Sequence, residues 1–189
     1  MQASTDVYGK VLLFLRSHSA HQIPHVNSNL LSHLEGTYEL LREWGSPAQL
    51  CLAGLCHAVY GTYGFELRLL DISQRSQLRD LIGAGAEEIV YFYASCDRQY
   101  LYPQIGRRSG LWFRDRFNGA EFVPDGPLFE SFLELTFANE LELVRADAFS
   151  IEQTRDTLGE LFKRCEGLVS RAAFGYFTNL YGLSEPERI

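Results

Sequence analysis

The pattern of apolar positions is clearest between Leu30 and Thr62, where two helical repeats meet at a short turn. In the first repeat, apolar residues recur at spacings of three and four, which is the period of an amphipathic helix. The second repeat, over 48–60, is apolar on nearly every face, as expected for a helix buried at the centre of a domain. Gly45 can take a positive φ between them, and the short connection favours antiparallel packing.

The same reasoning predicts helices in the rest of the chain. Their expected ranges are 7–16, 75–81, a helix beginning at 86, 128–144 and 151–176. The stretch 101–127 is expected to be a long irregular insertion, with a short hairpin that turns at Asn118 and Gly119. We therefore predict an all-α fold, a single domain over residues 1–189 built as a helical bundle.

Composition narrows the classes of function. The chain carries a net charge of −7, so binding to nucleic acid or to an anionic membrane is not expected. No apolar run approaches the roughly 18 residues of a membrane-spanning helix, and the first residues lack the pattern of a signal peptide. The four cysteines form no C-x-x-C motif, which favours reduced thiols and a cytoplasmic location.

Two histidines lie on the faces through which the two central helices are expected to pack. His33 shares a face with Gly36, and His57 shares one with Ala53 and Gly54. These small residues allow the two backbones to approach closely around the imidazoles. Either histidine alone is most simply a buried residue whose ring is satisfied by a carbonyl or hydroxyl group. Two of them on facing helices favour a functional site.

Three further histidines, His18, His21 and His25, lie in the polar loop before these helices. His18 and His21 are expected to be solvated. His25 lies close before His33 in the sequence and can fold back toward the pair, which would make a metal site of three imidazoles with open positions. Chance placement of His25 is the simpler alternative.

His33, together with the sequence LAGLCHAVYGT over 52–62, resembles the HD-domain superfamily of metal-dependent phosphohydrolases. The similarity extends over about 7–145 and is greatest to the hydrolase domain of ppGpp synthetase/hydrolase proteins. The signatures also resemble an uncharacterised family of small HD-related proteins. The resemblance implies an HD-like bundle in which His33 is the first metal ligand and His57 is the histidine of the HD pair.

The chain departs from the HD pattern at the acidic positions. Ala58 replaces the aspartate of the HD pair, Asn139 replaces the last aspartate ligand, and Gly61 with its neighbours replaces an acidic pair. Hard cations require carboxylate oxygens, so a remaining metal site would suit a divalent transition ion such as Zn, Fe or Mn. Hydrolysis of ppGpp is not expected. Asn139 interrupts an apolar helical face and needs a partner, either His57, a ligand or a backbone carbonyl.

Other polar residues are candidates for ligand binding. Asp97 and Arg98 form either a local ion pair and cap or a charged pair at the mouth of the pocket. Tyr60 and Thr62 lie at the end of the second central helix, and Thr62 is near the place of the family's threonine. The insertion carries basic residues amid aromatics, which favours a flap that presents arginine to an anionic ligand. Its arginines are Arg107, Arg108, Arg114 and Arg116.

Two classes of function stay open at this point. The first is an enzyme of the hydrolase or oxygenase type, with a metal at His33 and His57, acting on a small metabolite, either phosphorylated or not. The second is a catalytically inactive HD-like binding or interaction module without a metal. The retained histidines favour the first, and the lost aspartates favour the second. The sequence leaves the ligand and the oligomeric state open.

Overall fold

The computed structural model describes residues 2–107 and 110–183, and the fold is all-α, as the sequence predicts. Most of the helices pack around one hydrophobic core. The helices are α1 (Gln2–Ser17), α2 (Leu30–Glu43), α3 (Ala48–Cys56), α4 (Arg75–Ile82), α5 (Ala84–Ser95), α6 (Arg98–Leu101), α7 (Gly126–Arg145), α8 (Ile151–Thr154), α9 (Glu160–Lys163) and α10 (Arg171–Leu180). Two antiparallel hairpins complete the described part, β1 (Pro24–His25) with β2 (Ser28–Asn29) and β3 (Phe113–Arg114) with β4 (Glu121–Phe122).

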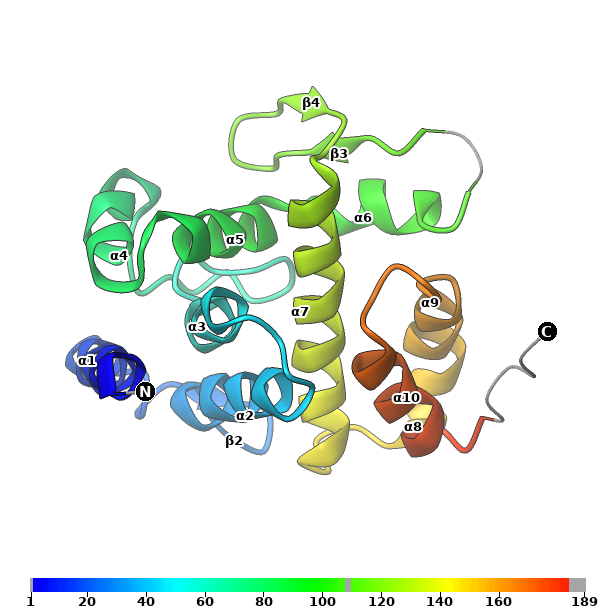
Figure 1. Cartoon of the computed structure of the whole chain (residues 1–189), viewed down its shortest axis with the longest axis horizontal. Coiled ribbons are helices and arrows are strands. Elements are labelled where there is room, and N and C mark those ends of the chain that lie inside the picture. Colours follow the sequence, from blue (N-terminus) through cyan, green and yellow to red (C-terminus); the bar gives the residue numbers. More distant parts are fainter. Residues whose placement is uncertain (1, 108–109, 184–189) are drawn as a thin grey trace.

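Helix α7 stands in the middle of the molecule (Figure 1). Helices α2, α3 and α5 pack against one side of it, and α8, α9 and α10 lie on the other. The Asp125 carboxylate caps the start of α7 by accepting a hydrogen bond from the Leu128 N–H at 3.4 Å. Pro127 lies in the first turn, where a backbone N–H would have no partner within the helix, so proline is tolerated there. Because α7 is covered on two sides, most of its residues from Phe132 to Val144 are buried.

Helices α2 and α3 form the antiparallel pair that the sequence predicts. The N-cap of α2 is Asn29, whose side chain accepts a hydrogen bond from the Ser32 N–H at 3.0 Å. Gly45 takes the expected positive φ, 74°. Helix α3 ends at Cys56, short of the predicted residue 60, and His57 occupies its C-cap. The chain then turns tightly, since the Val59 N–H bonds to the Cys56 carbonyl at 2.9 Å.

Two of the predicted helices have different limits in the structure. Gly83, with a φ of 86°, separates α4 from α5, and Gly85 lies inside α5 and does not end α4. The single helix expected over 151–176 is interrupted by a wide π turn at Arg155–Gly159 and by a bend at Gly167, whose φ is 75°. An apolar period alone did not reveal these breaks, because apolar side chains after the π turn still reach α7. Phe137 of α7 stacks on Phe162, with ring centroids 3.9 Å apart, and meets Phe177 edge to face at 6.0 Å.

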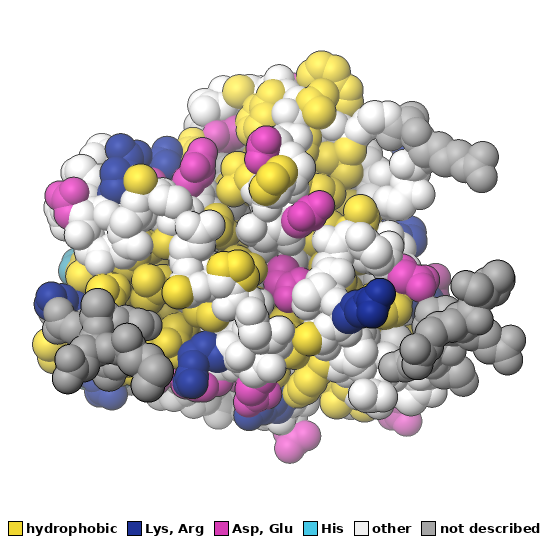
Figure 2. Space-filling model, in the orientation of Figure 1, with side chains coloured by type: hydrophobic (Ala, Val, Ile, Leu, Met, Phe, Trp, Pro, Cys, Tyr) yellow, Lys and Arg dark blue, Asp and Glu magenta, His cyan; other side chains and the backbone are white. Residues whose placement is uncertain are grey.

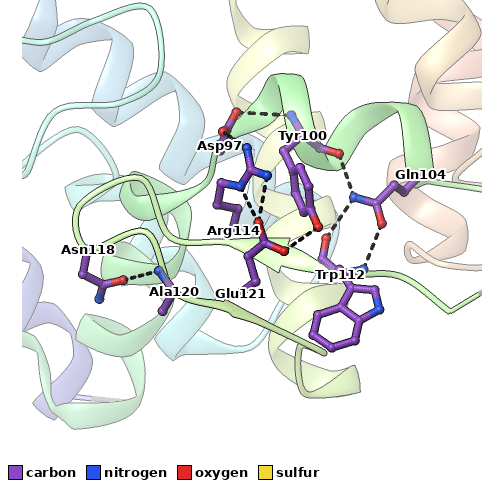
Figure 3. Close-up of polar contacts among 8 residues, drawn as sticks. All are labelled: Asp97, Tyr100, Gln104, Trp112, Arg114, Asn118, Ala120 and Glu121. Carbon is purple, nitrogen blue, oxygen red and sulfur yellow. Dashed lines mark hydrogen bonds and ion pairs between the residues drawn. The ribbon is translucent and has the colours of Figure 1, made fainter.

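The insertion before α7 is held against the end of α5. Its hairpin forms as predicted, with Gly119 at a φ of 75° in the turn. The backbone of β3 is hydrogen-bonded to the segment that follows α5, since the Asp97 N–H donates to the Arg114 carbonyl at 3.1 Å. Figure 3 shows the polar network on the outer side, where Arg114 lies between Glu121 and Asp97 and the Tyr100 hydroxyl donates to Glu121 at 2.9 Å.

The surface is mixed in character. The face drawn in Figure 2 carries acidic and basic side chains interspersed with apolar ones. Within residues 2–107 and 110–183, no helix combines the length and apolar character needed to cross a bilayer.

Gly54 marks the closest approach of α3 to α2. A Cβ atom at this position would lie 2.5 Å from Cδ1 of Leu41, which is fully buried. We therefore expect Gly54→Ala to lower the free energy of unfolding in urea by about 1–3 kcal/mol, because the core must shift to accept the methyl group. Gly175→Ala in α10 is the matched control. No atom lies within 4 Å of the added methyl group, so this variant should be neutral or slightly more stable. Equal effects of the two substitutions would show that the α2–α3 contact is not tight.

Candidate functional site

A pocket of about 150 Å³ opens where α2, α3 and α7 meet the loop that follows α3. Each of these elements contributes to its wall, together with β1 and the start of α6. Its polar lining includes the side chains of His25, His33, His57, Thr62, Arg98 and Asn139. Ala58, at the place where the resembling family has an aspartate, also lines the pocket.

His33 is held from α7 at both ring nitrogens. Its Nδ1 bonds to the Glu142 carboxylate, and its Nε2 lies 3.0 Å from Asn139 Oδ1. The amide of Asn139 is oriented by a hydrogen bond from its Nδ2 to Glu140 Oε1 at 3.0 Å, so its oxygen faces the ring. Each ring nitrogen of His33 therefore lies against an oxygen atom of α7.

Gly36 makes room for the side chain of Glu142. A Cβ atom at Gly36 would lie 2.7 Å from Glu142 Oε1 and 2.8 Å from Cγ of the same side chain. Gly36 was expected from the sequence at the contact with α3, and this prediction was wrong, because its nearest neighbours belong to α7. The small residue in the α2–α3 contact is Gly54, whereas Gly36 lets an acidic side chain of α7 cross α2 and reach His33.

His57 is fully enclosed and neutral. Its Nδ1 donates to the Gly54 carbonyl at 2.7 Å, which leaves the lone pair on Nε2. Burial, followed by repulsion from the neighbouring His33, lowers the pKa of His57 well below its usual value. The rings of His33 and His57 meet edge to face, with centroids 5.2 Å apart. The two predicted histidines are therefore brought together.

His25 reaches the same pocket from the first hairpin. Its ring lies 4.5 Å from that of His33 and meets Phe65 edge to face at 5.1 Å. Its Nε2 is buried and has no hydrogen-bond partner among the described residues. Burial, with repulsion from His33, lowers the pKa of His25 to about 4. The other two loop histidines lie elsewhere, because His18 bonds to the Phe14 carbonyl and His21 is exposed.

Arg98 brings a positive charge into the pocket wall from the first residue of α6. Its Nη1 contacts Glu140 Oε1 at 3.3 Å, and its guanidinium lies over the rings of Tyr93 and Tyr102, with centroids at 5.0 and 5.9 Å. Three buried polar atoms in this cluster have no hydrogen-bond partner within the described chain, namely Arg98 Nε and the hydroxyl oxygens of Tyr93 and Tyr102. Burial raises the pKa of both tyrosines, so both hydroxyls stay protonated.

Two predicted ligand-binding residues lie away from the pocket lining. The Tyr60 hydroxyl donates to Glu87 Oε1 at 3.0 Å, in a buried cluster with Arg75. Asp97 caps α6 by accepting from the Tyr100 N–H at 3.2 Å and lies 3.6 Å from Arg114. The Tyr60 hydroxyl and the Asp97 carboxylate are both used in contacts that hold the fold together. Neither residue lines the histidine pocket. Thr62 and Arg98 do line the pocket.

The insertion does not supply arginine to this pocket. Arg114 pairs with Glu121, and Arg116 pairs with Glu66 and donates to the Ala94 carbonyl at 2.7 Å. Arg107 is exposed and absent from the lining. Arg108 lies outside the described residues. The expectation of a flap over the histidines was therefore wrong for the described arginines, because the ends of the hairpin are tied to α5 and its charges are used there.

Several functional candidates were not found from the sequence. Glu140 and Glu142 looked like ordinary charged positions of α7, and Tyr93 and Tyr102 looked like core aromatics. A signal was present for Glu142, because it follows Asn139 by three residues and so shares its helical face. An acidic and an amide side chain on one otherwise apolar face indicate a buried partner on another helix.

Metal binding requires donors that converge. Among residues 2–107 and 110–183, no group of three or more histidine, cysteine, aspartate or glutamate side chains is placed to hold a metal ion. A metal at this pocket would therefore use the Asn139 amide oxygen beside imidazole nitrogens.

Comparison with known proteins identifies one family model. Residues 14–98 match a domain of unknown function (DUF6817), and this region contains α2, α3, α4, α5 and the three pocket histidines. No curated protein and no solved structure matches the chain. The matched region ends before α7, which supplies Asn139, Glu140 and Glu142.

The lowered pKa of His25 gives a pH prediction. The ring should titrate near pH 4 in the folded protein, against about 6.5 in the unfolded chain. Between these values the unfolded chain binds more protons, so the free energy of unfolding should fall as pH drops from about 6.5 to 4. NMR titration of the imidazole C–H signals measures the midpoint. His25→Gln should make the loss of stability over this window less steep. A midpoint near 6.5 would mean that His25 is solvated and outside the pocket.

Proposed function

We propose that the chain is an HD-related small-molecule-binding protein whose pocket holds an oxyanion, such as a carboxylate or a phosphate, against Arg98. The observation that carries this proposal is the set of unpartnered donors around Arg98. Buried polar groups normally find partners, and leaving one unmet costs about 1–3 kcal/mol. A ligand oxygen that binds the Arg98 guanidinium at the pocket wall would supply an acceptor to this cluster.

The charges in the pocket support an anionic ligand. Glu142 is committed to His33, so that pair is close to neutral. Arg98 has a single 3.3 Å contact with Glu140, and Glu140 Oε1 also accepts from Asn139. A guanidinium carries five donors, so Arg98 can bind a further acceptor beside Glu140. The neutral His57 adds no repulsive charge and offers a lone pair at Nε2 to a ligand hydroxyl.

The size of the pocket and its residues favour binding over hydrolysis of a nucleotide. About 150 Å³ admits a small group, whereas sites for drug-sized ligands span roughly 300–1,000 Å³. The methyl group of Ala58 and the amide of Asn139 supply neither a carboxylate nor a general base at the positions of the family's acids. Cleavage of ppGpp is therefore not part of this proposal. The HD relationship and the cytoplasmic location expected from the sequence are part of it.

Replacement of Arg98 tests the anion site. Acetate and inorganic phosphate, titrated into the protein and followed by NMR shifts of pocket residues, should bind the wild type. Arg98→Gln should weaken this binding at least tenfold, because a charged hydrogen bond of about 1.5–3 kcal/mol is lost. Arg114→Gln is the matched control. It removes an arginine of the exposed network in Figure 3 and should leave affinity unchanged.

Two results would overturn the anion site. One is the absence of saturable binding by either anion to the wild type. The other is unchanged affinity in an Arg98→Gln variant that remains folded by thermal melt. Equal losses in the Arg98 and Arg114 variants would indicate a general effect of net charge.

A second function, a metal-dependent enzyme acting on a small metabolite, is favoured by how the donors are held. Metal-binding histidines usually donate the far ring N–H to a carboxylate or a backbone carbonyl. Glu142 occupies that place for His33, and the Gly54 carbonyl occupies it for His57. If His33 released the Nε2 proton that it donates to Asn139, the Nε2 atoms of both rings and Asn139 Oδ1 would hold a transition ion such as Zn, Fe or Mn. Such an ion would polarise a substrate oxygen as a Lewis acid.

Asn139→Asp distinguishes the metal function from the metal-free one. If the donors form a metal site, the added carboxylate should tighten Zn²⁺ or Mn²⁺ binding at least tenfold in titration calorimetry, because it restores a charged oxygen ligand. In a metal-free pocket the same carboxylate lies beside Glu140 and Glu142 and should lower stability by up to several kcal/mol. The exposed Asn179→Asp adds the same charge on α10 and serves as the control. Lower stability without any gain in metal affinity would rule out the metal function.

A further inference from the structure

A second, larger pocket lies next to the histidine pocket. It has a volume of about 530 Å³, opens to solvent, and is lined by Tyr63, Arg98, Gln99, Tyr102 and Pro103. Tyr63 and Arg98 line both pockets. The two spaces are therefore neighbours that share one aromatic and one charged side chain, and we call the larger one the outer pocket.

The two pockets differ in chemistry. The inner one presents imidazoles, an amide and the charged Arg98, whereas most of the exposed surface of the outer one is apolar. Two tyrosine rings and a proline ring form its walls. Flat, rigid side chains of this kind bind apolar groups with little loss of conformational entropy.

We propose that the ligand is an amphipathic acid, with its oxyanion at Arg98 and an apolar body that lies in the outer pocket against Tyr63, Tyr102 and Pro103. This inference rests on the proposed anion site and extends it to the rest of the ligand. The inner pocket, at about 150 Å³, is too small for a whole metabolite of ordinary size, so the remainder must extend outward past the two shared residues. The outer pocket lies on that path and has the space.

Arg98 explains why one ligand can use both pockets. Its guanidinium is planar, and its ring contacts are with Tyr93 on the core side and Tyr102 on the outer side. Arg98 lines both pockets, so an oxygen bound to its guanidinium lies where the inner and outer spaces meet. Tyr102 lines the outer pocket, whereas its protonated hydroxyl is buried and has no partner in the described chain.

Carboxylates of increasing length test the apolar body. Acetate, butyrate, hexanoate and phenylacetate carry the same head group, and NMR or calorimetric titration gives their affinities. Each methylene that becomes buried should tighten binding roughly fourfold. Tyr63→Ala should reduce the gain per methylene, which is measured relative to acetate in the same variant. Tyr100→Ala removes a ring from the same short helix as Arg98, but on the outer network of Figure 3, and should keep the full gain.

The outcomes separate this inference from the anion site. If acetate binds through Arg98 and added methylenes give no gain, the amphipathic ligand is wrong and the anion site stands. If the gain is the same in Tyr63→Ala as in the wild type, the apolar body lies outside the outer pocket and the inference is overturned. If no acid of the series binds, both proposals fail.

Discussion

A single buried imidazole joins the two central helices α2 and α7. His33 on α2 lies between Glu142 and Asn139 on α7, and the side chain of Glu142 passes over the bare backbone of Gly36 to reach it. A buried charged pair contributes little net stability compared with an apolar contact, yet breaking it leaves an unpaired charge in the core. The contact therefore acts chiefly on register. It fixes the rotation and height of α7 relative to α2, and with them the place of every pocket residue on both helices.

The wall opposite α7 depends on a second backbone constraint. The chain leaves α3 at His57 and turns at Gly61, whose φ is 71°. A Cβ atom there would lie 3.2 Å from three carbonyl oxygens, those of Phe65, Glu66 and Leu67. Only glycine fits this turn without strain. The loop that follows folds back through paired hydrogen bonds between Thr62 and Phe65, so it closes the pocket beside His25.

The chemistry of the pocket follows from which charges are paired. Glu142 neutralises His33, and His57 and His25 are kept neutral by burial. Among the described residues that line the pocket, Arg98 carries the permanent positive charge, and its Nε has no partner. Where the resembling family places acids, this chain has the methyl of Ala58 and the amide of Asn139. A pocket of this composition is suited to hold an anion, and it retains neutral donors for a transition metal. It lacks the carboxylates that a phosphohydrolase uses to bind hard cations and activate water.

The sequence by itself determined the helices, the α2–α3 turn and the pairing of His33 with His57, because these depend on local period and on the backbone freedom of glycine. It also predicted the hairpin at Asn118 and Gly119. It did not determine the partners of α7, since a glutamate on an exposed helix and one that crosses a core have the same local pattern. Tyr60 was misplaced for a similar reason, because Glu87, to which its hydroxyl bonds, is distant in sequence. Asp97 took the local capping role that was one of its two expected alternatives. Only the tertiary structure decided which polar atoms share one enclosed space, since that depends on how the helices are rotated against each other.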